Sequence, residues 1–266
     1  MSPRLDAELA ARGLARSRSH ATQLIAGGLV SVDGRPVVKP SASVDASTTI
    51  DVAGADHYVS RGAHKLIAAL DAFAIAVEGR VALDLGASTG GFTQVLRERG
   101  ARPVLAVDVG HGQLSTVVAS DPDVVSVEGY NVRFMTADSL ASATGVAERP
   151  QVVTGDLSFI SLAHVLPAVV ATAATDAEVV LLIKPQFEVG RTAVKGGLVT
   201  DPALRSDAVH GVLWAAWDVG LRTNGLIASP IVGTHGNQEY VAWFSAAHGR
   251  DPSEWESTVT RLTGSR

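Results

Sequence analysis

Four charged side chains, in four separate segments of the chain, could together carry proton-transfer chemistry. Asp156 and Lys184 each follow a short apolar run, Glu239 opens a later one, and Lys65 precedes the first. A lysine directly after an apolar run is costly to bury unless an opposite charge faces it. Gathered in one crevice, ammonium and carboxylate groups can move a proton or stabilise a developing negative charge. For Asp156 and Lys184 a partly exposed ion pair is the alternative, and the residues alone leave both interpretations open.

Lysine is scarce in this chain, which makes a functional role for Lys65 and Lys184 more expected. Of the 22 basic residues only Lys39, Lys65, Lys184 and Lys195 are lysines, and the others are arginines. Codon bias in a GC-rich genome accounts for such a preference. A lysine that persists under this bias is less expected to be generic surface filler.

A glycine-rich turn offers a second kind of chemistry, the binding of a nucleotide-like cofactor. Residues 83–92 read LDLGASTGGF, which is typical of a strand that runs through a tight turn into a helix. Glycines in such a turn permit positive φ angles and a close approach of the backbone to a ligand. The segment lacks the Gly-Lys-Ser/Thr of a P-loop and the spacing of a dinucleotide-binding G-x-G-x-x-G. Asp108 ends the next apolar run, where a carboxylate can hold ribose hydroxyls by charge-assisted hydrogen bonds.

Together, the D-x-G-x-x-x-G-G-F pattern and the distal Asp108 resemble the S-adenosylmethionine site of class I methyltransferases. The resemblance implies S-adenosylmethionine as the cofactor. It also implies a set of cofactor-binding residues: Asp84, Gly86, Ala87, Ser88, Thr89, Gly90, Gly91, Phe92, Asp108, Val109 and Asp156. No metal site is expected, and the absence of cysteine excludes thiolate ligands and disulfides.

An α/β sheet must position these groups. From about residue 60, short apolar runs alternate with helical stretches, which is typical of a sheet with helices on both faces. The expected buried strands are 81–85, 104–107, 124–127, 152–153 and 179–183, and the expected helices are 66–73, 92–99, 162–170 and 203–217. Residues 227–232 and 240–244, joined by a tight loop, predict an antiparallel pair at one edge. The resemblance to class I methyltransferases implies a Rossmann-like, mostly parallel sheet of seven strands.

The first 53 residues predict a separate small α+β unit. Its expected elements are a helix from Leu5 to Leu14 that Gly13 can stop, a helix from Ser17 to Gly27, a strand at 29–32, an Asp33-Gly34 turn, a return strand at 37–38 and a strand at 48–52. Its R-L-D opening, its A-x-x-L-I-x-x-G-x-V step and its V-D-G-x-x-V-x-K-P segment resemble the ribosomal-protein-S-four-type RNA-binding module. That resemblance implies contacts with RNA phosphates. The expected RNA-binding residues are Arg4, Arg16, Arg18, His20 and Lys39 here, with Arg61 and His64 beside Lys65.

Charge and hydropathy restrict the function classes. The 266 residues carry a net charge of −5, which argues mildly against a nucleic-acid partner. Residues 1–65, however, hold 8 basic against 6 acidic residues, so the acidity belongs to the remainder. The amino terminus lacks the apolar run of a signal peptide, and no apolar run reaches the roughly 20 residues of a membrane span. We therefore expect a soluble, cytoplasmic protein without a membrane partner, a monomer with no stable protein partner.

Five sequence motifs, in a fixed order, indicate a protein family. SRGAHKL, DLGASTGGFT, DLSFISL, IKPQFEVG and GNQEY, behind the amino-terminal module, resemble the hemolysin-A/TlyA family of ribosomal RNA 2′-O-methyltransferases, part of the wider FtsJ-like group. The resemblance implies a catalytic tetrad of Lys65, Asp156, Lys184 and Glu239. It implies a cytidine 2′-hydroxyl in 16S rRNA, 23S rRNA or both, within ribosomal subunits, as the substrate. Lys184 would be central, either as a neutral base or as a protonated group that stabilises the oxyanion.

The same resemblance suggests domain limits and competing functions. We expect an RNA-binding domain at 1–55, a linker at 56–60, a methyltransferase domain at 61–248 and a carboxy-terminal tail with a short helix at 249–266. The alternatives are a membrane-active cytolysin, a non-catalytic ribosome-binding factor and a small-molecule methyltransferase. Removal of residues 1–55 should leave the activity of a small-molecule methyltransferase unchanged, whereas an rRNA enzyme should lose its binding to ribosomal subunits.

Several residues admit two interpretations. Phe187 and Glu188 could position the target nucleotide or pack at the start of a helix. Trp214 and Trp217, three residues apart on an expected helix, predict core positions. Tyr130 stands where the family tends to have threonine in an acidic-x-T-N-A-R segment, which could alter packing around the cofactor or the substrate.

Overall fold

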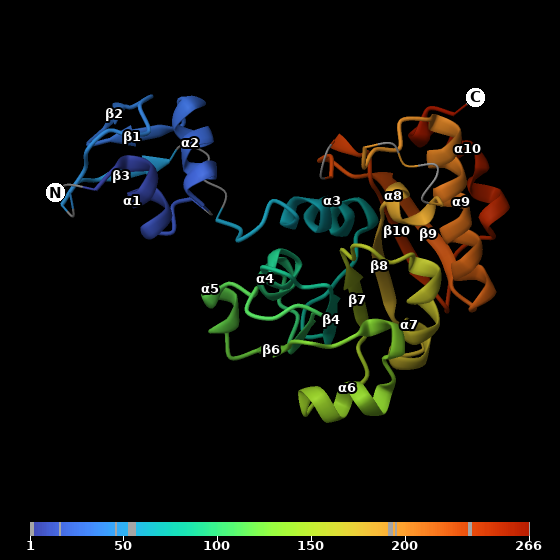
Figure 1. Cartoon of the computed structure of the whole chain (residues 1–266). Helices are drawn as coiled ribbons and strands as arrows, with labels where there is room; N and C mark the ends of the chain where they lie inside the picture. Colours follow the sequence, from blue (N-terminus) through green and yellow to red (C-terminus); the bar gives the residue numbers. More distant parts are fainter. Residues whose placement is uncertain are drawn as a thin grey trace. The chain divides into compact units, whose positions relative to one another are not determined.

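The chain folds into two compact units, residues 1–60 and residues 61–266 (Figure 1). The computed structural model describes residues 3–15, 17–45, 47–52, 57–190, 194, 196–233 and 236–265. Among these described residues no helix is both long and apolar enough to cross a membrane.

The first unit packs two helices on a small antiparallel sheet. Its elements are α1 (Leu5–Ala11), α2 (Arg18–Ala26), β1 (Val30–Val32), β2 (Arg35–Pro36) and β3 (Ile50–Val52), with the strand order β2-β1-β3. Its core is formed by Leu5, Leu9, Ala15, Ala21, Ile25, Val30, Val44 and Ile50. Ser17 caps α2 as expected, because its side chain accepts a hydrogen bond from the backbone N–H of His20.

The return strand of this unit was predicted two residues too late. Asp33 and Gly34 both adopt positive φ angles, 48° and 75°, which suits a two-residue hairpin turn. Val32 therefore pairs directly with Arg35, and β2 covers Arg35–Pro36 instead of residues 37–38. Leu14 likewise lies beyond the end of α1, which stops at Ala11.

The second unit contains one sheet of seven strands. They are β4 (Ala82–Leu85), β5 (Val104–Val107), β6 (Val124–Val127), β7 (Val152–Gly155), β8 (Glu178–Ile183), β9 (Arg222–Ala228) and β10 (Tyr240–Ser245). The strand order is β6-β5-β4-β7-β8-β10-β9, and only β10 runs antiparallel to its neighbours. This confirms the mostly parallel seven-stranded sheet of class I methyltransferases.

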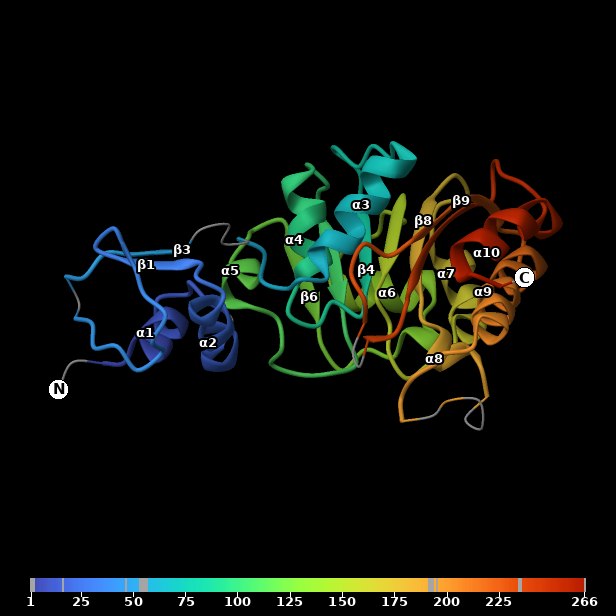
Figure 2. The same ribbon diagram turned by 90° about the horizontal axis from the view of Figure 1, so that it is seen from above.

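Helices cover both faces of this sheet. They are α3 (Ala63–Phe73), α4 (Gly91–Glu98), α5 (Thr116–Ala119), α6 (Ala137–Thr144), α7 (Leu166–Thr172), α8 (Pro185–Glu188), α9 (Pro202–Asp218) and α10 (Glu256–Thr263), with 3-10 turns at Val132–Phe134, Leu162–His164 and Pro252–Trp255. Helices α3 and α4 lie on one face, whereas α7 and α9 lie on the other (Figure 2). The predicted helix at 162–170 is split, because Pro167 has no N–H to donate and opens α7 after the 3-10 turn.

Two expectations for the end of the chain were wrong. Strand β9 begins at Arg222 and ends at Ala228, so the connection to β10 is longer than the tight loop predicted. Pro230 cannot donate to a sheet ladder, which stops β9 short of the predicted end at residue 232. Trp214 and Trp217 are not core residues, since they remain 43% and 37% exposed on the side of α9 that faces away from the sheet.

A buried carboxyl group joins three elements beneath the glycine-rich turn. Asp84 in β4 is 1% exposed and accepts hydrogen bonds from Thr93 Oγ1 of α4 at 2.7 Å and from Thr154 Oγ1 of β7 at 3.3 Å. Burial raises the pKa of Asp84 to about 7, and these two hydrogen bonds offset only part of that effect. The group therefore lies under the turn and links α4 to the central strands.

Asp84→Asn should change how stability depends on pH. A raised carboxyl pKa means that the folded state binds more protons than the unfolded state between about pH 4 and 7, so stability falls as pH rises through that window. A shift of about 3 pKa units corresponds to roughly 4 kcal/mol at most. We expect the free energy of unfolding of the wild type, relative to the asparagine variant, to decrease by up to that amount from pH 4 to 7.5. Urea unfolding followed by tryptophan fluorescence measures it in the second unit, where all four tryptophans lie; a pH-independent difference would contradict the expectation.

Candidate active site

The structure brings the four predicted charged residues together in one ion-pair chain. Lys65 Nζ lies 2.7 Å from Glu239 Oε2 and 3.4 Å from Asp156 Oδ2. The other oxygen of Asp156 lies 2.6 Å from Lys184 Nζ. Asp156 thus bridges the two lysines, and two positive charges are matched by two negative ones.

The strand order explains why residues so far apart in sequence meet. Asp156 and Lys184 follow the neighbouring parallel strands β7 and β8, so both lie at the same edge of the sheet. Because β10 runs antiparallel to β8 and pairs Tyr240 with Ile183, its preceding residue Glu239 lies at that edge too. Lys65 comes from the first turn of α3.

Burial differs among the four groups. Lys65, Lys184 and Glu239 are 7%, 8% and 2% exposed, whereas the Asp156 side chain remains 22% exposed. Charges this deeply buried are tolerated only when they are paired. The partly exposed group, Asp156, also lines the large cavity described below. The two buried lysines are therefore held by carboxylates within reach of a ligand.

Because Gly233 has no side chain, the Glu239 carboxylate has room beside it. The backbone N–H of Gly233 donates to the carbonyl of Asn237 at 2.8 Å and closes the turn before β10. A Cβ atom at position 233 would overlap Glu239 Oε1 and lie 2.5 Å from its Cδ. Any side chain at this position would displace the Glu239 carboxylate, which is buried and paired with Lys65.

A cavity of about 510 Å³ opens at the same edge of the sheet. It is lined by Gly86, Ser88, Asp108, Val109, Gln113, Tyr130, Asn131, Val132, Asp156, Leu157, Ser158, Phe159 and Ile160. Its volume falls within the range of small-molecule sites. Gly86 has a φ of 78°, and a Cβ there would lie 3.0 Å from Leu157 Cδ2, so only glycine suits the floor of this cavity.

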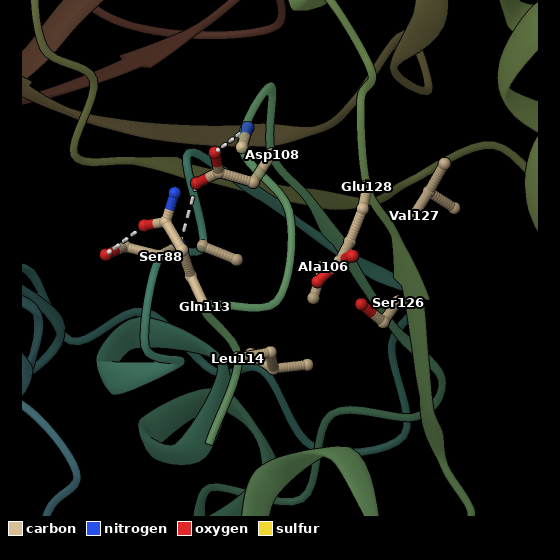
Figure 3. A pocket seen from close by; sticks show the side chains of 10 residues that line it. Ser88, Ala106, Asp108, Gln113, Leu114, Ser126, Val127 and Glu128 are labelled. Carbon is tan, nitrogen blue, oxygen red and sulfur yellow. Dashed lines mark hydrogen bonds between the residues drawn. The ribbon is translucent and has the colours of Figure 1, made fainter. Parts of the chain in front are cut away.

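Asp108 ties the glycine-rich turn to the loop after β5. Its Oδ2 accepts from the N–H of Ser88 at 2.8 Å and its Oδ1 from the N–H of Gly110 at 2.7 Å (Figure 3). Ser88 also contacts Gln113 through its Oγ, at 3.3 Å. These residues surround a narrow crevice that Ala106, Ser126 and Glu128 also line. A carboxylate oxygen can accept several hydrogen bonds, so Asp108 can also bind ribose hydroxyls.

The predicted cofactor residues divide into three groups. Gly86, Ser88, Asp108, Val109 and Asp156 line the large cavity, and Ala87 lines the crevice beside it. Asp84 is buried below the turn, as described above. Outside both linings are Thr89, Gly90, Gly91 and Phe92, which form the turn and the start of α4.

Four lining residues that were not predicted follow a predicted strand end directly. Leu157, Ser158, Phe159 and Ile160 come directly after Asp156, as Val109 comes after Asp108. The position of Asp156 at a strand end was therefore the signal that could have found them. Tyr130 lines the cavity as well, and its hydroxyl lies 2.7 Å from Ser139 Oγ, which belongs to the N-terminal cap of α6.

The predicted RNA-binding residues of the first unit include two arginines that share one carboxylate. Arg4 Nε and Arg18 Nη2 lie 3.0 and 3.1 Å from the nearly buried Asp6. They hold the pKa of Asp6 at about 2, with Arg4 contributing most. Lys39 is exposed and His20 partly exposed, while Arg16 lies outside the described residues. In the second unit, Arg61 and His64 are exposed at the start of α3.

Comparisons with known proteins give a consistent result. The chain matches the sequence profile of the FtsJ-like methyltransferases over residues 58–246 and that of the S4 domain over residues 3–50. It is 51% identical to the 16S/23S rRNA (cytidine-2′-O)-methyltransferase TlyA of Mycobacterium tuberculosis, over 90% of this chain and 88% of that one. It is 38% identical to Hemolysin A of Brachyspira hyodysenteriae, over 91% and 99% of the two chains. The solved structure of a candidate hemolysin from Streptococcus thermophilus, 34% identical, covers 99% of this chain and 96% of its own with a TM-score of 0.76.

Gly233→Ala should disturb one lysine more than the others. With only four lysines in the chain, selective isotope labelling gives four Nζ resonances. We expect the Lys65 resonance to shift, because the new methyl group displaces Glu239 from its contact at 2.7 Å. Lys39, in the first unit, serves as the internal reference. An unchanged Lys65 resonance in a folded variant would show that Glu239 accommodates the methyl group without leaving Lys65.

Proposed function

Since this chain belongs to the FtsJ-like methyltransferase family, we propose that it transfers the methyl group of S-adenosylmethionine to a ribose 2′-hydroxyl of ribosomal RNA. The observation that supports this most strongly is the ion-pair chain of Lys65, Asp156, Lys184 and Glu239 beside a cavity that a further carboxylate, Asp108, also lines. The relative from M. tuberculosis is named for cytidines of 16S and 23S rRNA. We extend that substrate to this chain, which would act on ribosomal subunits in the cytoplasm.

The cavity fits the proposed cofactor in size and in donor chemistry. Asp108 would hold the ribose hydroxyls, and the close approach permitted by Gly86 would admit the amino acid part above the glycine-rich turn. When bound there, S-adenosylmethionine supplies an electrophilic methyl group. Asp156 belongs both to the cavity lining and to the ion-pair chain, so the proposed catalytic groups would lie next to that methyl group.

The ion-pair chain would activate the ribose hydroxyl. Lys184 Nζ donates to Ser158 Oγ at 2.9 Å and lies 2.6 Å from Asp156 Oδ1, and an ammonium group has three donors, so it can also donate to the 2′-oxygen. The 2′-oxygen would bond to the methyl carbon as the carbon–sulfur bond breaks and leaves its electron pair on sulfur. The hydroxyl proton would pass to Lys184 if that lysine is neutral, or to solvent if it is protonated, and the negative charge that develops on the oxygen would face Lys184. Lys65 and Glu239 fix the second oxygen of Asp156 and keep the bridging carboxylate in place. Such preorganised charge is a strong source of rate acceleration.

An exposed aromatic residue beside these groups would hold the target base. The Phe159 ring is 91% exposed, and its centroid lies 5.1 Å from that of Phe187. The centroid of the Phe187 ring in turn lies 5.9 Å from Lys184 Nζ. Aromatic rings in this position can stack on an unpaired base and so place its ribose next to the lysine.

The first unit would bind the surrounding RNA. It carries the match to the S4 domain, and Arg4, Arg18 and Lys39 are exposed on it. Contacts of this type read backbone shape and charge instead of base identity. Removal of residues 1–55 should therefore abolish methylation of ribosomal subunits, whereas a small-molecule methyltransferase would retain its activity.

The hemolysin names of two relatives define the competing function. Mapping of ribose methylation on 16S and 23S rRNA, with and without the purified protein, tests the proposal directly. Methylated cytidines that depend on the protein would support it. Hemolysis by detergent-free protein without any RNA methylation would favour a cytolysin, and subunit binding without methyl transfer would favour a ribosome-binding factor.

Lys184→Ala should abolish methyl transfer but retain cofactor binding. Lys184 contacts Asp156 and Ser158 but does not line the cavity, so calorimetric binding of S-adenosylmethionine should stay close to that of the wild type. We expect turnover on ribosomal subunits to fall by about 10²-fold or more, since one preorganised group at an oxyanion is worth that much. Near-normal turnover would remove Lys184 from the mechanism.

Phe159→Ala should weaken methylation through the RNA substrate. Loss of one stacking contact costs about 1–3 kcal/mol, so we expect kcat/KM for ribosomal subunits to fall by about 5- to 150-fold. Phe159→Trp should restore most of it. Phe134→Ala is the matched control, because Phe134 is also an exposed phenylalanine and lies outside the cavity lining. An equal loss in both alanine variants would argue against a specific base contact at Phe159.

A further inference from the structure

The loop after β7 and the turn after β8 are tied together at several successive points. Asp156 and Ser158 both contact Lys184 Nζ, at 2.6 and 2.9 Å. Further along, the rings of Phe159 and Phe187 meet at 5.1 Å. We call residues 156–162 the strand-end loop. Successive residues of this loop contact successive residues of the other segment: Ser158 contacts Lys184, Phe159 contacts Phe187, and Ser161 contacts Glu188. The two segments therefore run side by side, starting at the ion-pair chain.

Glu188 closes this series at its outer end. Its Oε2 accepts from the hydroxyl of Ser161 at 2.6 Å, and its Oε1 accepts from the backbone N–H of Leu162 at 3.0 Å. Both carboxylate oxygens are thus occupied by the far end of the strand-end loop. Ser161 Oγ also accepts from the N–H of Ala163, which caps the 3-10 turn that follows. Of the two roles expected for Glu188, these contacts favour packing over a direct nucleotide contact.

The residue in the middle of the loop needs such support. Phe159 has a φ of 65°, a left-handed conformation that is unfavourable for a bulky side chain by about 1–3 kcal/mol. Its ring is almost fully exposed, so burial of the ring does not stabilise this conformation. Conformations of this kind persist only where the flanking structure holds them. Here Ser158 is held on one side by Lys184, and Ser161 and Leu162 are held on the other by Glu188.

We propose that Glu188, together with Ser161, is a positioning pair that holds Phe159 in its left-handed conformation and thereby places the target nucleotide over Lys184. The inference deepens the proposed function and rests on it. Glu188 would act through the loop, because its side chain hydrogen-bonds Ser161 and Leu162, which belong neither to the ion-pair chain nor to the cavity lining.

The surroundings of Glu188 suit a structural carboxylate. Burial raises its pKa, the hydrogen bonds from Ser161 and Leu162 lower it, and His164 adds a smaller lowering effect from the 3-10 turn. The N–H of Leu162 needs an acceptor at this position, whereas the Ser161 hydroxyl can either donate or accept, and neither hydrogen bond requires a negative charge. Glutamine supplies one acceptor for Leu162 and one donor for the Ser161 hydroxyl, so it should preserve the link.

A double-mutant cycle on the full chain tests the proposal. We expect Glu188→Ala to reduce kcat on ribosomal subunits by about 10- to 100-fold, since a small misplacement of reacting groups has effects of that size. Glu188→Gln should stay within about 3-fold of the wild type. In a Phe159→Ala background, Glu188→Ala should cost less than about 3-fold, because the residue through which it acts is already gone. Glu256→Ala, which removes an exposed carboxylate from α10, is the control for loss of charge.

Hydrogen exchange of the backbone amides of residues 158–162 gives a second readout that does not depend on activity. We expect faster exchange in Glu188→Ala, and wild-type exchange in Glu188→Gln. Equal kinetic effects of Glu188→Ala in both backgrounds, or unaltered exchange, would overturn the proposal. A wild-type protein without methyl transfer would instead refute the proposed function, and the exchange experiment would still judge whether Glu188 holds the loop.

Discussion

The bridging of two buried lysines by Asp156 is the interaction on which the site depends. A buried ammonium group without a counter charge is strongly destabilising, and here two of them lie within the reach of one carboxylate. The arrangement works only if β7 and β8 are adjacent and end at the same level, if β10 enters antiparallel beside β8, and if α3 begins above them. The order of the strands is therefore a requirement of the charge pairing as much as of the hydrophobic core.

A second carboxylate, Asp108, organises the backbone around the cavity. Asp108 accepts N–H groups from both the glycine-rich turn and the loop after β5, so it fixes the two backbone segments that border the cavity. Asp84, although part of the same sequence motif, works from below and has no access to the cavity. Of the two carboxylates, Asp108 thus lines the cavity, whereas Asp84 stabilises the glycine-rich turn from below.

Much of this site could be predicted from sequence, because strand ends are marked by apolar runs that stop at a charged residue. That pattern identified Asp108, Asp156 and Lys184, and the parallel sheet implied that they meet. Residues held by irregular backbone escaped this reasoning. The exposed ring of Phe159 and the contacts of Glu188 with Ser161 and Leu162 depend on a left-handed residue and a 3-10 turn, neither of which has a hydrophobic period. Strand β9 was misplaced for a related reason, since its first residues are polar and follow no apolar run.

The position of β10 in the sheet has a consequence for folding during synthesis. This strand is the last of the sheet to be synthesised, yet it lies between β8 and β9 and not at an edge. Strand β9 cannot join the rest of the sheet until residues 240–245 have left the ribosome, and pairings between segments distant in sequence form slowly. Glu239 arrives with the same segment. Lys65 therefore lacks its nearest partner until residue 239 has been made, and a chain that stops before Glu239 cannot assemble the complete set of charges.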